Sequence, residues 1–196
     1  ISAFLAGMLI VPLVLPLRQF ALERFKGQNL ILVWVIIEEV LKYCAALIVV
    51  LWNRAVDEPI DAIIYMITIA LGFAALENAL FVFSPLQAGD YAYSFISNNF
   101  RFLGAMLLHV LASGTVGVCM ALAYYASRWV KVTVATLGLC IAIVLHALFN
   151  FFIMDASGET VLGVFMFVWM GIIVLFLFFE RVKQLEKQHR RANASL

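Results

Sequence analysis

The chain has 196 residues, of which 65% are hydrophobic and only 13% are charged, and its formal net charge is +1. A soluble domain carries charge on about a quarter of its residues, so this composition excludes an ordinary soluble fold and favours a membrane protein. The three cysteines lie inside apolar runs and indicate no disulfide framework, and the near-neutral charge gives no reason to expect a nucleic-acid partner.

Apolar runs of about 20 residues, the length that a helix needs to cross a bilayer, follow one another along the chain. They predict an all-α, polytopic transmembrane bundle of about six spans that forms a single domain over residues 1–196. The expected spans are about residues 1–17, 29–52, 60–83, 99–126, 132–154 and 160–179, with a basic tail over 180–196. Because the chain begins with Ile1 rather than methionine, we expect a further segment before it in the original protein.

Two regions outside the clearest spans carry specific expectations. Pro12 and Pro16 are expected to kink or end the first helix, and residues 18–28 to form a short amphipathic piece at the membrane interface. Residues 84–98 are expected to be the longest polar connection and a cover for the bundle.

The distribution of positive charge predicts the orientation in the membrane. Six spans place both termini on one side, which collects Arg54, Arg128, Lys131 and the cations of the tail. By the positive-inside rule this side is cytoplasmic, so we expect a multi-pass protein of the cell membrane with cytoplasmic N- and C-termini. The cations within residues 18–26 run against this orientation.

Glu38, Glu39 and Lys42 lie in the middle of the second apolar run. A charged side chain at the bilayer centre costs about 2.5–3.5 kcal/mol on insertion scales, so these residues are expected to face protein or trapped water and to be functional. At about 100° per residue, Lys42 lies near the face of both carboxylates and can neutralise either one. The alternative is a buried ion pair with only a structural role.

Glu77, His109 and His146 lie inside three other expected spans. At a rise of about 1.5 Å per residue, they and the glutamate pair all fall roughly 9–15 Å below the same non-cytoplasmic surface. Ser113 and Asn150 each follow one of the histidines by four residues, on the same helix face. The sequence therefore predicts one polar cluster built from four helices, in which Ser113 packs or donates a hydrogen bond rather than acting as a nucleophile.

Glutamates and histidines that face one another in a medium of low dielectric can hydrolyse a bond without a covalent nucleophile. A carboxylate acts as general base on a water molecule that an imidazole shares, and a second imidazole with an amide stabilises an oxyanion. His109 and His146 with Glu38 or Glu39 also match a zinc site with an open position. A third alternative is a non-enzymatic proton-coupled carrier or scaffold, because buried glutamate and histidine also serve as proton relays.

Four motifs on successive expected spans resemble those of PrsW-type intramembrane proteases, relatives of the Abi and CAAX-prenyl endopeptidase group. In chain order they are Glu38-Glu39-x-x-Lys42, Gly72-Phe73-Ala74 leading to Glu77-Asn78, His109-x-x-x-Ser113 and His146-x-x-x-Asn150. The resemblance covers about residues 30–150 and leaves the first and sixth spans outside it. Phe81 stands where the family suggests a tyrosine, and Ala105 where CAAX-type relatives carry phenylalanine, which argues against prenylated substrates.

This resemblance implies a glutamic-type intramembrane endopeptidase that needs no cofactor. Its expected partners are the lipid bilayer and a membrane-anchored protein substrate, such as an anti-sigma factor, which is cut near the extracytoplasmic face. In that scheme Glu38 or Glu39 is the catalytic base, with Glu38 favoured, and His109 is its partner on the water. His146 and Asn150 form the oxyanion side. The supporting residues are Lys42, Glu77, Asn78 and Ser113.

Overall fold

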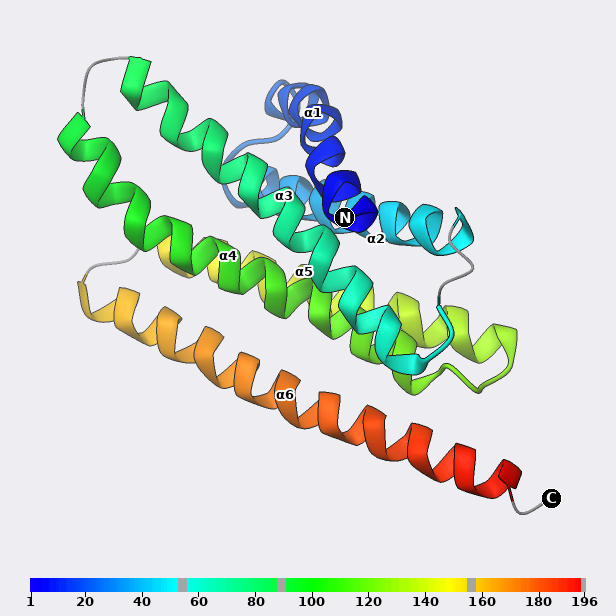
Figure 1. The fold of residues 1–196 in the computed structure, drawn as a ribbon. Helices are drawn as coiled ribbons and strands as arrows, with labels where there is room; N and C mark the ends of the chain where they lie inside the picture. Colours follow the sequence, from blue (N-terminus) through cyan, green and yellow to red (C-terminus); the bar gives the residue numbers. More distant parts are fainter. Residues whose placement is uncertain (53–55, 88–90, 155–157, 195–196) are drawn as a thin grey trace.

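The computed structural model describes residues 1–52, 56–87, 91–154 and 158–194, and all the regular secondary structure in these ranges is helical (Figure 1). The helices are α1 (Ser2–Leu22), α2 (Gly27–Trp52), α3 (Pro59–Gln87), α4 (Tyr91–Leu122), α5 (Arg128–Met154) and α6 (Gly158–Ala194). The prediction of an all-α polytopic bundle is therefore confirmed.

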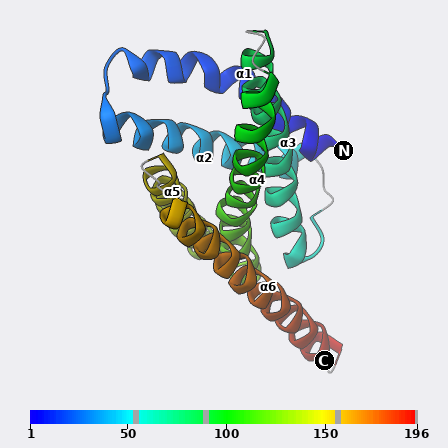
Figure 2. The same cartoon turned by 90° about the vertical axis from the view of Figure 1, so that its left-hand side faces the viewer.

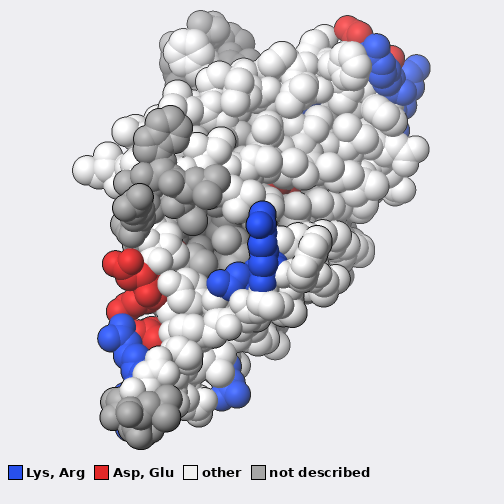
Figure 3. All heavy atoms as spheres, turned by 90° about the vertical axis from the view of Figure 1, so that its right-hand side faces the viewer, with Lys and Arg blue, Asp and Glu red and all other residues white. Residues whose placement is uncertain are grey.

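Five of the described helices, α1 and α3 to α6, are long and apolar enough to cross a membrane. The remaining helix, α2, is continuous, but Glu38, Glu39 and Lys42 interrupt its apolar sequence. Every 18-residue stretch of α2 contains all three charged residues, so α2 is not among the five. Charged side chains occupy only a few patches of the face in Figure 3, and most of that surface is uncharged. The chain is therefore a multi-pass membrane protein, and α2 is the helix whose charges need protein partners.

Several helices extend beyond the limits that the sequence suggests. α1 continues through Pro12 and Pro16 to Leu22, so residues 18–22 belong to this helix and not to a separate interfacial piece. The prediction of a long polar connection over residues 84–98 is wrong, because α3 extends to Gln87 and α4 begins at Tyr91. The basic tail continues α6 to Ala194. Polar composition marks where a helix leaves the apolar layer of a membrane, and a helix can continue past that level.

α4 lies at the centre of the bundle and packs against α3, α5 and α6. Figure 2 shows that α1 and α2 run antiparallel to each other. α1 packs across α3, and α2 packs against α3, α4 and α5. The turn between α1 and α2 ends at Gly27, which has a φ of +58°, a value in the left-handed region that favours glycine.

α1 and α3 make a close backbone contact at two glycines. A Cβ atom added at Gly7 would lie against the carbonyl oxygen of Ile69, and one added at Gly72 against the carbonyl oxygen of Phe4. Small residues allow membrane helices to approach this closely, so the two glycines set where α1 crosses α3. This crossing brings α1 over the face of the bundle that carries the polar residues.

Candidate active site

Four helices bring the predicted ionisable side chains together in one buried cluster. α2 contributes Glu38, Glu39 and Lys42, whereas Glu77, His109 and His146 come from α3, α4 and α5. All six residues are between 0% and 8% exposed. The hydrogen bonds and ion pairs described next connect them directly.

Lys42 lies between a carboxylate of its own helix and a histidine of α4. Its Nζ atom is 2.5 Å from Oε1 of Glu39 and 3.0 Å from Nδ1 of His109. The same Nζ atom lies 5.1 Å from the ring centroid of Phe73, whose ring also packs edge-on against His109 at a centroid distance of 5.2 Å. Phe73 is fully buried, so an aromatic ring closes this side of the cluster.

Both ring nitrogens of His109 have partners. Because the Lys42 ammonium can only donate, Nδ1 of His109 accepts and the ring proton lies on Nε2. That Nε2 atom is 3.2 Å from Oε2 of Glu77, which accepts its hydrogen bond. His109 is thereby held as a neutral ring between a cation and a carboxylate.

His146 has one nitrogen engaged and one directed at Glu38. Its Nδ1 atom lies 2.7 Å from Oε1 of Glu39, and its Nε2 atom lies 3.9 Å from Oε2 of Glu38. Its ring contacts that of His109 at a centroid distance of 5.0 Å and an interplanar angle of 85°. The Oε2 atoms of Glu38 and Glu39 are buried and have no hydrogen-bond partner among the described residues.

Arg18 also belongs to this cluster, although the sequence places it in an interfacial piece. Its Nη2 atom donates to Oε1 of Glu38 and, at 2.8 Å, to Oε1 of Glu77. The Arg18 side chain is 20% exposed, more than any of its partners in the cluster. The sequence offers one signal for this role of Arg18. The residue follows a long apolar segment, at a place where a cation runs against the orientation that the positive-inside rule predicts.

The side chains of three predicted site residues form no hydrogen bond with any other residue in the described part of the chain. Asn78 and Ser113 are buried, with Nδ2 of the first and Oγ of the second lacking partners. Asn150 is half-buried on α5, one turn after His146. The structure thus brings the ionisable residues into contact and leaves these three as neighbours along their helices.

The acidic side chains of the cluster outnumber its arginine and lysine side chains. Glu38, Glu39 and Glu77 supply three negative charges, and Arg18 and Lys42 supply two positive ones, which leaves one negative charge while both histidines are neutral. Burying an unbalanced charge is costly, so one additional proton or a bound cation would be stabilising here.

Glu38, His109 and His146 are the residues that could hold a metal ion. Each offers one ligand atom, and these three atoms lie within 4.8 Å of one another. Two histidines and one carboxylate are a common zinc donor set, and Glu39 binds the second nitrogen of His146 as an outer carboxylate does in many zinc sites. The donor types therefore fit zinc, although His109 would have to give up Lys42 or Glu77 to bind it.

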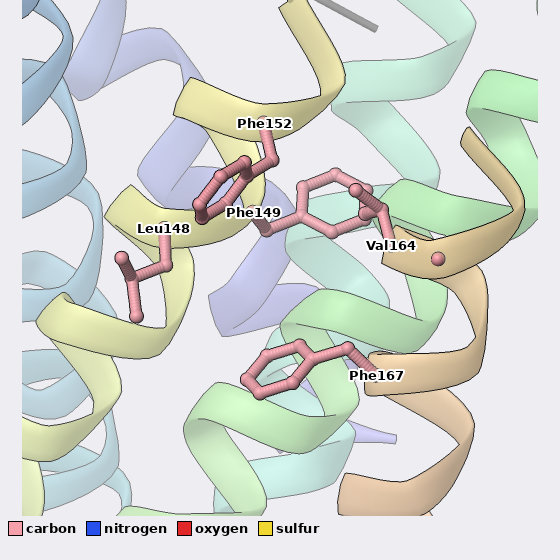
Figure 4. Close-up of a pocket in the computed structure, with 6 residues that line it drawn as sticks. Leu148, Phe149, Phe152, Val164 and Phe167 are labelled. Carbon is pink, nitrogen blue, oxygen red and sulfur yellow. The ribbon is translucent and has the colours of Figure 1, made fainter. Parts of the chain in front are cut away.

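An apolar cavity of about 300 Å³ lies between α5 and α6, apart from the polar cluster (Figure 4). It is lined by Leu148, Phe149, Phe152, Gly163, Val164 and Phe167. This lining offers no group for acid–base or metal chemistry.

A buried cluster of glutamates and histidines inside a membrane bundle marks a functional site, in which such side chains act as proton relays or as general acids and bases. The family model of the PrsW family intramembrane metalloproteases matches residues 1–178, from α1 through most of α6. The chain belongs to this family and is an intramembrane protease, as its four motifs predict. Comparisons with curated proteins and with solved structures found no match.

Family membership favours the protease over the carrier or scaffold that the sequence leaves open. The family's description names a metalloprotease, whereas the sequence favours a glutamic type that needs no metal. The choice between these two types therefore stays a prediction.

Proposed function

We propose that the chain is an endopeptidase that cuts a membrane-anchored protein by means of a water molecule activated by Glu38. The observation that carries this proposal is the pair formed by Oε2 of Glu38, which is buried and has no partner, and Nε2 of His146, 3.9 Å away. Because a hydrogen bond spans about 2.8 Å, one water molecule can bond to both atoms at once. Glu38 then takes the proton as the water attacks the peptide carbonyl.

The contacts support a role for His146 different from the one that the resemblance implies. His146 donates from Nδ1 to Glu39 and keeps the Nε2 lone pair for the water, whereas both nitrogens of His109 are engaged. We therefore assign His146 to the water side and His109 to the support of Lys42 and Glu77. Asn150, one turn after His146, remains the candidate for stabilising the oxyanion.

The proposed substrate is a protein anchored in the same cell membrane and cut near the extracytoplasmic face, such as an anti-sigma factor. Cytoplasmic termini, which the positive-inside rule supports, place the cluster on that side of the bilayer centre. Glu38 then returns the proton to the leaving amine nitrogen as the C–N bond breaks, so each peptide bond that is cut consumes one water molecule and regenerates the Glu38 carboxylate.

The test compares wild type with Glu38→Gln and Glu39→Gln, using the exposed Glu23→Gln as a matched control. In cells, the membrane proteomes are compared for an intact protein that accumulates with the two site variants and not with the control. In vitro, the purified proteins are incubated with fluorescently labelled casein and with the accumulated protein. The mechanism proposed for Glu38 is wrong if Glu38→Gln cleaves as fast as wild type, and the supporting role of Glu39 is wrong if Glu39→Gln does so.

A zinc-dependent protease is the second candidate, and the convergence of Glu38, His109 and His146 supports it. Zinc bound by these residues would polarise the peptide carbonyl and promote ionisation of a bound water. Elemental analysis of the purified protein, followed by chelation and zinc add-back, separates the two types. Activity that survives complete removal of metal excludes zinc, and activity that is lost and then restored by zinc excludes the metal-free mechanism.

A further inference from the structure

Arg18 is held at both its backbone and its side chain by Trp34 of α2. The Trp34 indole Nε1 donates to the carbonyl oxygen of Arg18 at 3.2 Å. The guanidinium carbon lies 5.4 Å from the Trp34 ring centroid, within the range of a cation–π interaction. These contacts aim the guanidinium inward, whereas an arginine that only marks the membrane surface would extend towards water.

Inside the cluster, Arg18 binds one oxygen of each of two carboxylates. Its Nη2 atom donates to Oε1 of Glu38 and to Oε1 of Glu77. The second oxygen of Glu77 accepts from Nε2 of His109 at 3.2 Å, and the second oxygen of Glu38 lies 3.9 Å from Nε2 of His146. Arg18 thus determines which oxygen of each carboxylate faces a histidine.

We propose that Arg18 is a positioning residue of the protease site, which fixes the Glu38 and Glu77 carboxylates so that each presents a single oxygen to its histidine. The inference rests on the proposed protease function and extends it to a helix that carries none of the four motifs. Without Arg18, the two carboxylates lose their shared cation, repel each other and rotate about their last torsion. Glu38 Oε2 would then no longer be held in place for the water.

Docking of α1 on the bundle does not depend on Arg18 alone. Ala3, Ile10, Val11 and Val14 of α1 are buried in an apolar cluster with residues of α2 to α5. The backbone crossing at Gly7 and Gly72 adds a further contact far along α1 from Arg18. A variant of Arg18 can therefore keep its fold while losing the carboxylate geometry, which makes the positioning role testable.

The experiment compares Arg18→Gln and Arg18→Lys with Arg24→Gln in the purified full-length chain, with labelled casein and the accumulated substrate protein as probes. Arg24 is a suitable control because its side chain is exposed and its partners lie outside the cluster. They are Glu23, at 3.6 Å, and the carbonyl oxygen of Phe20, at 3.3 Å. In metal sites, loss of a residue that orients a ligand lowers activity by about 10- to 100-fold, and we expect a fall of similar size in kcat for Arg18→Gln because Arg18 orients Glu38 in the same way. KM should change little, Arg18→Lys should recover part of kcat, and Arg24→Gln should match wild type.

Melting curves and circular dichroism identify which variants are folded. The inference is overturned if folded Arg18→Gln retains the wild-type kcat, or if kcat falls only in proportion to unfolded protein and Arg18→Lys recovers nothing. These results differ from failure of the protease function itself, in which wild type cleaves neither probe and the inference falls with it. A folded Arg18→Gln whose loss appears entirely in KM also overturns the positioning role and points to substrate binding.

Discussion

Glu39 and His146 form the shortest contact between α2 and α5 in the cluster, with 2.7 Å between Oε1 and Nδ1. The same oxygen accepts from Lys42 at 2.5 Å, so two donors converge on it. Oε1 of Glu39 thereby orients Lys42 and His146, whereas its buried Oε2 has no partner in the described part of the chain. This relationship separates the two adjacent glutamates, because Glu38 presents its free oxygen to the other nitrogen of His146.

The two glutamates should therefore differ in the size of their effects. Glu39→Gln removes an orienting partner, and we expect about a 10- to 100-fold loss in kcat. Glu38→Gln removes the general base, for which the loss is about 10²- to 10⁴-fold. The measurement is kcat on labelled casein with Glu23→Gln as control. A larger loss for Glu39→Gln would assign the base to Glu39 instead.

Substitutions of the two histidines should lower kcat by different amounts in the same assay. His146→Gln removes the nitrogen that faces Glu38, so we expect the general acid–base loss of about 10²-fold or more. His109→Gln keeps an amide that can still bond to Lys42 or Glu77, and a smaller loss is expected because this ring holds its neighbours in place. If His109→Gln loses more activity than His146→Gln, the roles are those that the family resemblance implies.

Lys42 should matter for stability as well as for activity. Its side chain is fully buried between Glu39 and His109, and Lys42→Met would leave the Glu39 carboxylate without its cation. Removing one partner of a buried ion pair destabilises a protein by about 3–5 kcal/mol. The matched control is Lys26→Met in the exposed turn after α1. Thermal melting in detergent should show a clear fall for Lys42→Met alone, and equal melting temperatures would contradict the ion-pair energetics.

The convergence of four helices on one cluster could be predicted because depth in a membrane follows from counting residues along a helix. The sequence could not predict which side chains pair with one another inside the cluster. Spacing of four residues suggests that His109 acts with Ser113 and His146 with Asn150, yet both histidines bond to carboxylates of other helices. Spacing along one helix identifies a shared face, and the partner across the interface depends on how the helices cross.

Arg18 shows a second limit of the same kind. Two prolines and several polar residues made the end of the first span look like an interfacial segment, since each proline lacks an N–H and strains a helix. In the structure α1 continues past both prolines, and this continuation carries Arg18 to Glu38 and Glu77. A tertiary contact outweighed the local preference, and no pattern within α1 itself specifies such a contact.

The glycine crossing between α1 and α3 provides a test of this arrangement that does not touch the polar residues. Gly7→Ala would place a Cβ atom against the Ile69 carbonyl, a backbone atom that cannot move aside. Overpacking typically costs about 1–3 kcal/mol, and here α1 must also shift, which withdraws Arg18 from Glu38. We therefore expect both a lower melting temperature and a lower kcat.

The matched control for this change is Gly163→Ala in α6, where an added Cβ meets nothing within 4 Å. That substitution should leave both measurements at the wild-type level. Because Gly7 lies far along α1 from Arg18, a joint fall in stability and kcat for Gly7→Ala links the crossing to the geometry of the site. Wild-type kcat in Gly7→Ala protein of lowered stability would show that the position of α1 does not govern the Glu38 carboxylate.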